Sequence, residues 1–553
     1  MKELKTNSSP FVNFNQKISF LFDGKKIFGF KGDTIASALL RNNINLVGRS
    51  FKYHRPRGIY TCGIEEPNAL VQIISEYSEP NTRATIKKIY EGMEVESQNR
   101  WPSLDNDIGS INSLFSPLFS AGFYYKTFMG PHKSFWKKIY EPIIRRAAGL
   151  GKPPKEFRAL SSHLHHNVDI VIVGAGLNGL LAAKSLINTN HDILLVDFDN
   201  HLGGIINNSA KISSIDNQSP QEWVKSTVEA IEKSKNIKIL KNTLVTTYNY
   251  INHLIAVEDK HVGSRPSENK VNNILHKIRT DHIILCNGHI ERFLSFQNND
   301  LPGIMLASSF EKYICRYGTL PSKEPVIFSN NSNSNSLIYS IINQGYKPKA
   351  YIDSRSGENI EPELFDLIRK HDIPLYTNSQ IKGVSGGKRI EKILIEDSTG
   401  GLSEIYSDFL CVSGGINPDV HLFTQSKGLL DWDEKDLTYK PSKPFQPTIT
   451  LGSASGQFNL EKVSDEINEK LKIFKNKVLD TQIVLNTKES YQIEKLWEIS
   501  PHKSSMWSKS FIDLQNDVTT KDIRQAISEG FDRIEHLKRY TTNSMGTDQG
   551  KIS

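Results

Sequence analysis

The sequence predicts an α/β protein with two dinucleotide-type βαβ units in its core and a small α+β domain before them. Three observations support this fold class. Residues 168–197 join a glycine-rich turn to two apolar runs, residues 326–353 repeat a strand–helix–strand pattern, and residues 20–30 alternate around Asp23-Gly24. Apolar runs separated by helical patterns are typical of parallel sheets, whereas alternation around Asp-Gly indicates an antiparallel hairpin.

Length and composition are those of an ordinary multi-domain protein. The 553 residues correspond to about three to four domains. The chain is 38% hydrophobic and 23% charged, with a mean hydropathy of −0.41. No apolar run approaches the roughly 20 residues needed to cross a bilayer, and the first ten residues are polar, without a signal-peptide core. We therefore expect a cytoplasmic protein without a membrane segment.

Charge and cysteine content argue against several function classes. The net charge of +7 is modest for this length, so nucleic-acid binding is not indicated. The four cysteines lie far apart without a C-x-x-C pair, which argues against a disulfide framework and a four-cysteine metal site. A basic and aromatic segment at residues 124–158 has two interpretations, a solvated face or an interface with an acidic partner.

Residues 1–98 are predicted to form the small α+β domain. The hairpin at residues 20–30 is followed by an amphipathic helix at residues 34–42, capped by Asp33, and by a strand at residues 69–74. This ββα opening is typical of small ferredoxin-like folds. A basic loop, rich in Arg, Lys and His, follows at residues 48–58. Iron–sulfur relatives of such domains place several cysteines after this loop, but here only Cys62 is present, and one thiolate cannot hold a cluster. We expect a 2Fe-2S ferredoxin-like domain that has lost its iron–sulfur cluster and serves as a scaffold.

Residues 99–166 are predicted to be an extended segment followed by a linker. Residues 99–130 are rich in Ser, Asn, Phe and Pro with weak periodicity, and residues 149–166 have linker composition. The linker contains three histidines, which are His163, His165 and His166. No cysteine or carboxylate cluster lies near them, so we expect a flexible, solvated segment and no metal site.

The glycine-rich turn GAGLNG at residues 174–179 has the spacing Gly-x-Gly-x-x-Gly. Gly174 permits the tight turn, Gly176 lets the backbone approach a pyrophosphate, and Gly179 lets the following helix lie close to the strand. The helix N-terminus then presents its unsatisfied N–H groups and the positive end of its dipole to the phosphates. The turn therefore predicts a dinucleotide site.

An acid ends the second strand of this unit. Asp197 follows the apolar run at residues 193–196, at the position where a carboxylate accepts hydrogen bonds from the adenosine ribose diol. A 2′-phosphate at the same place would meet like charge. The motif therefore favours NAD or FAD over NADP, and by itself it does not separate NAD from FAD.

The chain continues the first unit, inserts a second unit and then returns to the first. We predict a helix at residues 223–234, a strand pair within residues 237–250, and strands that run into glycine turns at residues 281–288 and 408–415. Residues 448–456 close the region.

The inserted unit has strands at residues 326–329 and 350–353 and a helix at residues 337–344. Its first turn, residues 329–332, reads SNNS in place of a glycine fingerprint. Polar side chains there would crowd a pyrophosphate that approaches the backbone, so this unit is expected to keep the fold without the ligand.

The expected boundaries are 167–318 and 406–475 for a Rossmann domain that binds the nucleotide, 319–405 for the second, degenerate dinucleotide-type domain, and 476–553 for a small helical C-terminal segment. In that last segment Thr519 and Asp522 form a capping pair before helices at residues 521–529 and 533–539. The core resembles the two-dinucleotide-domain flavoproteins of the glutathione reductase type. Their redox cysteine pair is missing from the first helix, so disulfide reductase activity is not expected.

Long strings in this chain resemble the alpha subunit of heterotetrameric sarcosine oxidase. The first is GRSFKYHRPRGIYTCGIEEPNALV at residues 48–71. The others are WPS at 101–103, AGFYYKTFM at 121–129, YEPIIRRAAG at 140–149, NNDLPGIMLA at 298–307, FIDLQ at 511–515 and EHLKRYTTNSMGTDQGK at 535–551. The resemblance extends through most of the chain, and strings of this length are specific.

The resemblance implies a set of cofactors and partners. In that family the alpha subunit binds a structural NAD, the beta subunit carries FAD and the amine-oxidising site, and a covalent FMN lies at the boundary between them. Small gamma and delta subunits complete the assembly. The implied reaction is oxidative demethylation of sarcosine to glycine with formation of hydrogen peroxide, and no catalytic residue is expected on this chain.

The resemblance also implies which residues contact the nucleotide, in addition to the fingerprint. The full expected set is Gly174, Ala175, Gly176, Asn178, Gly179, Asp197, Phe198, Asp199, Gly204, Ile205, Leu244, Gly288, Ser453, Phe458 and Leu460. Ile205 departs from the hydroxyl residue expected there, which removes one hydrogen bond.

The basic loop offers a further candidate site. Its cationic residues are Arg49, Lys52, His54, Arg55 and Arg57. They either bind a phosphate, such as that of FMN, or form salt bridges with a partner or another domain. Both interpretations are open because guanidinium groups match phosphate and carboxylate oxygens equally well.

The chain lacks one part of the family pattern. The family's alpha subunit normally continues into an aminomethyltransferase-like domain that binds tetrahydrofolate, and this chain stops where that domain begins. Either the sequence is truncated, or the folate part is a separate polypeptide, or it has been lost. On this chain alone we expect no folate site.

Two other functions stay open at this point. The first is the alpha-type subunit of a related amine dehydrogenase complex acting on proline, an opine or glycine. The N-terminal domain of such subunits often retains the cluster cysteines, so their absence here argues against this function. A stand-alone NAD(P)H-dependent flavin reductase is the alternative from a different class. It would need a second intact fingerprint, which residues 329–332 do not supply.

Overall fold

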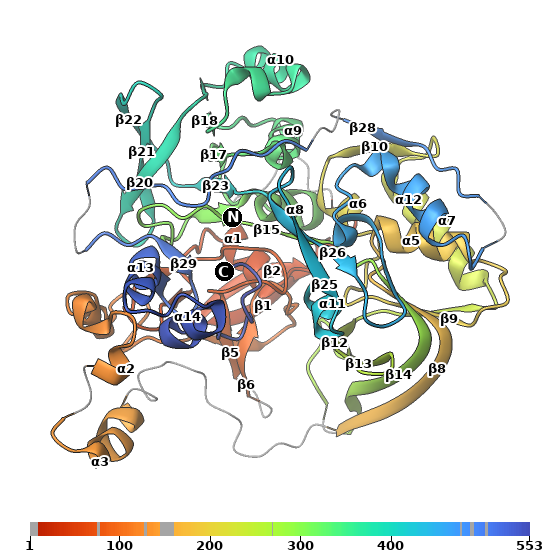
Figure 1. Cartoon of the computed structure of the whole chain (residues 1–553), viewed down its shortest axis with the longest axis horizontal. Helices are drawn as coiled ribbons and strands as arrows, with labels where there is room; N and C mark the ends of the chain where they lie inside the picture. The colour runs from red at the N-terminus through yellow and green to blue at the C-terminus, as the bar shows by residue number, and fades with distance from the viewer. Residues whose placement is uncertain are drawn as a thin grey trace.

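Three large β-sheets organise the chain in the computed structural model, which describes residues 9–74, 78–126, 130–143, 160–267, 269–475, 478–486, 491–503 and 507–553. In Figure 1 the N-terminal sheet lies low in the centre, the sheet of the first nucleotide unit to the right, and that of the second unit at the upper left. The α/β core with a preceding α+β domain is thus as the sequence predicts.

The N-terminal sheet is built around the predicted hairpin. β1 (Asn13–Phe22) and β2 (Lys25–Lys31) pair antiparallel around Asp23-Gly24, where both residues have positive φ, at 48° and 76°. Three further strands complete it in the order β2-β1-β7-β5-β6, and these are β5 (Leu70–Ile74), β6 (Glu79–Arg83) and β7 (Met93–Ser97).

The helix of this domain, α1 (Ile35–Arg41), has a different cap from the one predicted. Thr34 is the N-cap and forms a capping box with Ser37. Asp33 instead accepts a hydrogen bond from the Ser37 hydroxyl at 2.8 Å and pairs with Arg41 at 3.2 Å, both fully buried. The prediction of Asp33 as the cap is wrong because the buried arginine needs that carboxylate.

The first unit has a seven-stranded sheet in the order β11-β9-β8-β14-β13-β12, with β27 also paired to β14. Its parallel strands are β8 (Leu160–Val173), β9 (Ile193–Val196), β11 (Ile237–Leu240), β14 (Val271–Leu285) and β27 (Thr448–Thr450). Its antiparallel strands are β12 (Thr243–Asn249) and β13 (His253–Asp259). The helices that cover one face are α5 (Leu177–Ser185), α7 (Pro220–Lys233) and α12 (Val463–Lys470).

The predicted linker is wrong for residues 160–166. They extend β8 and pair in parallel with β14, from Val271 opposite Leu160 onward. His166 and His276 lie within hydrogen-bond distance, at 2.9 Å between Nε2 and Nδ1, so pairing with β14 orders this histidine. The rest of the predicted linker, residues 149–159, lies outside the described residues.

The second unit is a five-stranded parallel sheet in the order β16-β23-β17-β18-β19. Its strands are β16 (Ile304–Leu306), β17 (Val326–Ser329), β18 (Ala350–Asp353), β19 (Leu375–Tyr376) and β23 (Leu410–Ser413). Its helices are α8 (Ala307–Tyr317), α9 (Asn335–Asn343) and α10 (Pro362–Lys370). β16 and β23 lie outside the expected range 319–405, yet both belong to this sheet, because β23 pairs with β17 and β16 pairs with β23.

Short elements connect the two units and complete the first. An antiparallel ribbon of β20 (Gln380–Gly386), β21 (Ile390–Glu396) and β22 (Leu402–Tyr406) follows β19. The others that matter below are α6 (Ile205–Asn208), β15 (His289–Glu291), β24 (Ile416–Pro418), η4 (Ser332–Ser334) and η6 (Gly452–Ser455).

The C-terminal segment folds back on the N-terminal half of the chain. β29 (Phe511–Asp513) and β30 (Val518–Thr519) precede α13 (Thr520–Ser528) and α14 (Ile534–Thr541). The predicted capping box of Thr519 with Asp522 is confirmed. Ala121, beside α2 (Phe123–Lys126), packs with residues of α13 and α14, and Figure 1 shows the blue C-terminal helices beside the orange α2. No helix in the described ranges is long and apolar enough to cross a membrane.

Candidate nucleotide site

The turn between β8 and α5 has the geometry that its glycines predict. Gly174 has φ +96°, and a Cβ there would lie 2.5 Å from the carbonyl oxygen of Cys286. A Cβ on Gly179 would lie 1.8 Å from the carbonyl oxygen of Gly174. Both positions therefore exclude any side chain, because real Cβ contacts are never so short.

Gly176 has a different environment. It is the N-cap of α5 with no side-chain cap, and a Cβ there would meet only the Cα of Gly204, at 3.7 Å. The turn at residues 203–204 approaches from the other side, where Gly203 N–H donates to the Ala175 carbonyl at 2.8 Å. The two turns hold each other in place and leave the start of α5 uncapped, as an anion site requires.

Asp197 lies beside this turn. One carboxylate oxygen accepts from the backbone N–H of Ala175 at 2.5 Å and the other from that of Asp199 at 2.7 Å. Burial raises the pKa of Asp197 to about 6. The structure therefore brings the predicted ribose acid to the fingerprint.

The two residues after Asp197 have separate environments. The side chain of Phe198 is 44% exposed. Asp199 pairs with Arg316 of α8 at 2.6 Å, and although burial opposes ionisation, Arg316 holds the pKa of Asp199 below its usual value. The Asp199 carboxylate thus has a protein partner, which the sequence did not indicate.

The far side of the turn contains polar atoms without partners. Gly288 has φ +83° and open space where a Cβ would point. Asn178 Oδ1 and Asn287 Oδ1 are buried and have no hydrogen-bond partner among the described residues, whereas Asn287 Nδ2 donates to the Asp419 carbonyl at 2.6 Å. Buried acceptors are normally satisfied, so these two oxygens fit a ligand that donates hydrogen bonds, as ribose does. We conclude that the residues present fit an adenine dinucleotide.

The other residues expected to contact the nucleotide divide into two groups: those in segments beside the glycine-rich turn, and those that pack against protein. Gly452, next to Ser453 in η6, faces Asn178, since a Cβ on Gly452 would lie 2.0 Å from Asn178 Nδ2. Leu244 is on β12, where the neighbouring Thr243 N–H donates to the Asp197 carbonyl at 2.8 Å. The segments that contain Ser453 and Leu244 therefore lie beside the glycine-rich turn and Asp197.

Three hydrophobic residues of the expected set contact protein. Ile205 begins α6 and packs against the core around α5. Leu460 is buried in that same core. The Phe458 ring packs against Tyr491, with the ring centroids 5.1 Å apart.

The SNNS turn of the second unit is filled by its own side chains. Ser329, Asn330 and Asn331 are fully buried. Asn331 Nδ2 donates to the Ser413 carbonyl at 3.1 Å, and Asn330 Nδ2 donates to the Glu494 carbonyl at 3.0 Å. These side chains occupy the region where glycines would admit a pyrophosphate, as the sequence predicts.

In the structure the arginines of the basic loop form salt bridges with acids of other domains, which is one of the two interpretations of this loop. Arg55 pairs with Asp300 at 2.7 Å, and Arg57 pairs with both Asp300 and Asp517. Burial opposes ionisation of Asp300, yet Arg55 and Arg57 hold its pKa below the usual value. Asp517 also accepts from the backbone N–H of Lys52 at 2.7 Å. Asp300 lies within the family-like string at residues 298–307, and Asp517 lies just after the one at residues 511–515. No spacing rule in the sequence pairs these acids with the basic loop.

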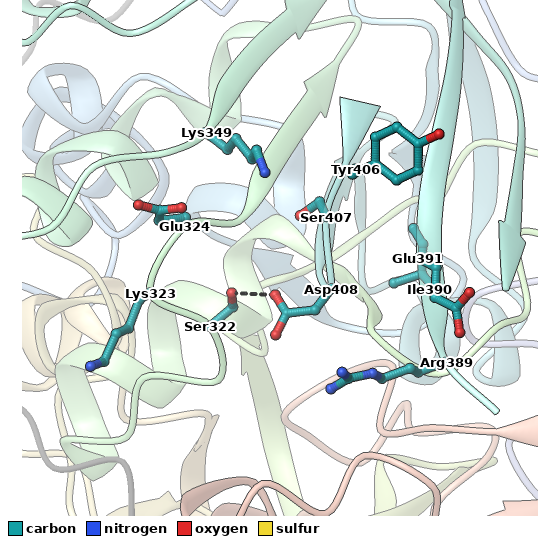
Figure 2. Close-up of a pocket in the computed structure, with 10 residues that line it drawn as sticks. All are labelled: Ser322, Lys323, Glu324, Lys349, Arg389, Ile390, Glu391, Tyr406, Ser407 and Asp408. Carbon is teal, nitrogen blue, oxygen red and sulfur yellow. Dashed lines mark hydrogen bonds between the residues drawn. The ribbon is translucent and has the colours of Figure 1, made fainter. Parts of the chain in front are cut away.

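A cavity of about 560 Å³ lies away from the fingerprint, at the second unit. Figure 2 shows its lining residues, which come from the segment before β17, from Lys349 before β18, and from the β21 and β22 region. Its charged residues are Lys323, Lys349, Arg389, Glu324, Glu391 and Asp408. Three of these residues are cations and three are acids. Asp408 accepts a hydrogen bond from the Ser322 hydroxyl at 2.8 Å. Because the lining has as many cations as acids, it favours neither an anionic nor a cationic ligand.

No group of three or more His, Cys, Asp or Glu residues within the described ranges can hold a metal ion. Cys62, Cys286, Cys315 and Cys411 are all free thiols. Burial raises the pKa of Cys62 to about 11, so it is a protonated, packed side chain.

Protein-family models match three parts of the chain. Residues 15–100 match a 2Fe-2S iron-sulfur cluster binding domain, residues 172–227 match an NAD(P)-binding Rossmann-like domain, and residues 507–553 match the sarcosine oxidase A3 domain. Within residues 15–100 the sequence has one cysteine, Cys62. The residues present there do not fit a cluster held by cysteines.

Whole-chain comparison extends these matches. The sarcosine oxidase subunit alpha of Rhizobium meliloti (strain 1021) is 37% identical over 557 residues, covering 98% of this chain and 54% of the relative. The chain is similar to sarcosine oxidase alpha subunits along almost its whole length. That of Corynebacterium sp. (strain P-1) is 25% identical over 98% of this chain and 53% of the relative. The chain spans about half the length of the sarcosine oxidase alpha subunits that it matches.

A solved structure shares the fold. L-proline dehydrogenase from P. horikoshii aligns with a TM-score of 0.62 and 18% identity, covering 100% of this chain and 92% of its own. The succession of a small N-terminal domain and a two-unit core is therefore an architecture already seen in a solved protein.

Proposed function

We propose that this chain is the NAD-binding alpha subunit of a sarcosine oxidase complex. The observation that carries the proposal is the 37% identity to a sarcosine oxidase subunit alpha over 98% of the chain, together with a fingerprint turn whose geometry fits an adenine dinucleotide. The complex would demethylate sarcosine to glycine and form hydrogen peroxide. FAD would belong to a beta subunit, FMN to the alpha–beta boundary, and gamma and delta subunits would complete the assembly.

NAD would have a structural role in this site. The uncapped N-terminus of α5 would hold the pyrophosphate, and Asp197 would accept hydrogen bonds from the adenosine ribose. Asn178 Oδ1 and Asn287 Oδ1 are the two further acceptors on the far side. The buried Cys286 beside the turn supplies no thiolate, because burial raises its pKa far above neutrality. The chain itself would contribute no catalytic group.

The N-terminal domain would act as a scaffold without an iron–sulfur cluster. Its one cysteine, Cys62, is buried and protonated. Arg55 and Arg57 connect this domain to acids of the core and of the C-terminal segment. In this proposal the domain positions neighbouring parts of the chain and transfers no electrons.

A second candidate is the alpha subunit of a proline-type amine dehydrogenase. The likeness in fold to L-proline dehydrogenase over the whole chain favours it. The lower sequence identity, 18% against 37%, places it behind sarcosine oxidase.

The test is purification of the native complex by a tag on this chain, followed by two assays. We expect acid denaturation to release a nucleotide that co-elutes with NAD, and we expect the complex to form hydrogen peroxide with sarcosine as substrate. Oxidation of L-proline without oxidation of sarcosine would select the second candidate. Release of FAD alone from this chain would reject the structural role of NAD.

The pH dependence of nucleotide retention tests the role of Asp197. Its carboxyl has a pKa of about 6 in the free protein because it is buried. Ribose hydroxyls donate to the ionised form, so binding lowers this pKa, and affinity is full above pH 6 and falls as the pH drops through that value. Equilibrium dialysis with NAD between pH 5 and pH 8 measures the effect.

The matched variant is Asp197→Asn. It should bind NAD more weakly at pH 8, by about 1–3 kcal/mol for a charge-assisted hydrogen bond, and its affinity should be flat across the same pH range. A variant that keeps the wild-type pH profile would show that another group titrates.

A further inference from the structure

A second acid and a set of cations lie at the ribose end of the nucleotide site. The backbone N–H of Asp199 donates to the Asp197 carboxylate at 2.7 Å, so the two acids are neighbours. The Asp199 carboxylate itself accepts from Arg316 of α8 at 2.6 and 2.7 Å. The Arg316 side chain is 4% exposed, which means that its guanidinium is buried beside the position expected for the ribose.

The N-terminal domain reaches the same place. The Phe11 ring centroid lies 5.1 Å from the Arg316 guanidinium and 4.8 Å from the ring of His201. The Ser9 hydroxyl donates to the Arg316 carbonyl. Lys88, which lies between β6 and β7, interacts electrostatically with Asp199, as does Lys312 of α8.

We propose that Asp199 acts together with Asp197 to fix the nucleotide as NAD, because Asp199 neutralises Arg316 and Lys88, two cations that would otherwise accept the 2′-phosphate of NADP. The inference rests on the proposed NAD site and deepens it. Proteins that bind NADP use an arginine near the ribose for that phosphate, and a guanidinium fork matches phosphate oxygens. Here the arginine is present but its fork is occupied by a carboxylate.

Two consequences follow from this arrangement. Selection against NADP has two parts, repulsion by Asp197 and loss of the free cation through Asp199. In addition, the N-terminal domain supplies one of the cations that Asp199 neutralises, since Lys88 belongs to it. A domain that matches an iron–sulfur family would then serve the nucleotide site of its neighbour.

The experiment is a competition on the purified full chain. Protein is equilibrated with equimolar NAD and NADP, desalted and denatured with acid, and the ratio of released NADP to NAD is measured by chromatography. Wild type should retain NAD in large excess. Asp199→Asn should raise the ratio by about tenfold or more, because it frees Arg316 and Lys88.

Two controls make the result specific. Asp199→Asn combined with Arg316→Met should lose most of that gain, since the cation is then absent. Asp192→Asn, which removes the same charge at an exposed position of the same unit, should leave the ratio at the wild-type value. A gain of equal size in Asp192→Asn, or a gain that survives Arg316→Met, would overturn the proposal in favour of general charge effects.

Folding of the variants is checked by their thermal unfolding. If Asp199→Asn does not fold, Lys88→Glu at its half-buried site provides the test, and it should lower the ratio of NADP to NAD by about threefold. An unchanged ratio in that variant contradicts the inference. If wild type retains neither nucleotide, the proposed function fails; if wild type retains NAD and Asp199→Asn gains no NADP, only the inference fails.

Discussion

Gly176→Ala should give a folded protein that retains little or no NAD. The backbone at Gly176 has φ −71° and ψ −170°, which alanine adopts without strain, and the nearest atom to the new methyl group would be 3.7 Å away. Folding is therefore expected to be unaffected. The methyl group would instead occupy the space through which the pyrophosphate approaches the backbone, which weakens binding by roughly 1–3 kcal/mol or more. Acid release of nucleotide from the purified variant measures the loss.

Gly179→Ala is the matched control, because it adds the same methyl group three residues later. There the Cβ would lie 1.8 Å from the Gly174 carbonyl oxygen, so the turn must deform. This variant should lose stability as well as NAD, seen as a lower midpoint of thermal unfolding. If both variants bound NAD like wild type, the fingerprint would not be the nucleotide site.

Asp300→Asn should destabilise the protein by about 3–5 kcal/mol, because it leaves buried cations without their carboxylate. The Asp300 side chain is 0% exposed, and those of Arg55 and Arg57 are 18% and 2% exposed. Asn keeps the shape of the side chain but removes the charge that compensates both guanidinium groups. Urea unfolding followed by circular dichroism measures the free energy of unfolding.

Asp105→Asn is the comparison for an exposed pair. Asp105 lies 3.0 Å from Lys388 with side chains 53% and 55% exposed. Its loss should cost less than about 1 kcal/mol, as expected for a solvated ion pair. Equal losses in the two variants would mean that the Asp300 network contributes no more than a surface pair.

The local features of the candidate nucleotide site could be predicted from the sequence, because they depend on short-range rules. The fingerprint glycines, the acid at the end of β9 and the filled SNNS turn each follow from residue types at fixed spacing. The capping box at Thr519 is equally local, and the structure confirms it.

Features that depend on partners far along the chain were not predictable in this way. Asp33 has helix-cap chemistry, but a buried arginine from α1 takes its carboxylate. Residues 160–166 have linker composition, but more than a hundred residues later β14 provides a strand to pair with. Arg316 reaches Asp199 from a helix 117 positions away, and no spacing rule connects them.

The pairing of Arg57 with Asp517 has a consequence for biosynthesis. Asp517 also accepts from the backbone N–H groups of Lys52 and Tyr53, so one acid near the end of the chain completes a loop near its beginning. Ribosomes release the N-terminus first. While a nascent chain is still emerging, this loop lacks its final partner, and the loop can close only after residue 517 has left the ribosome.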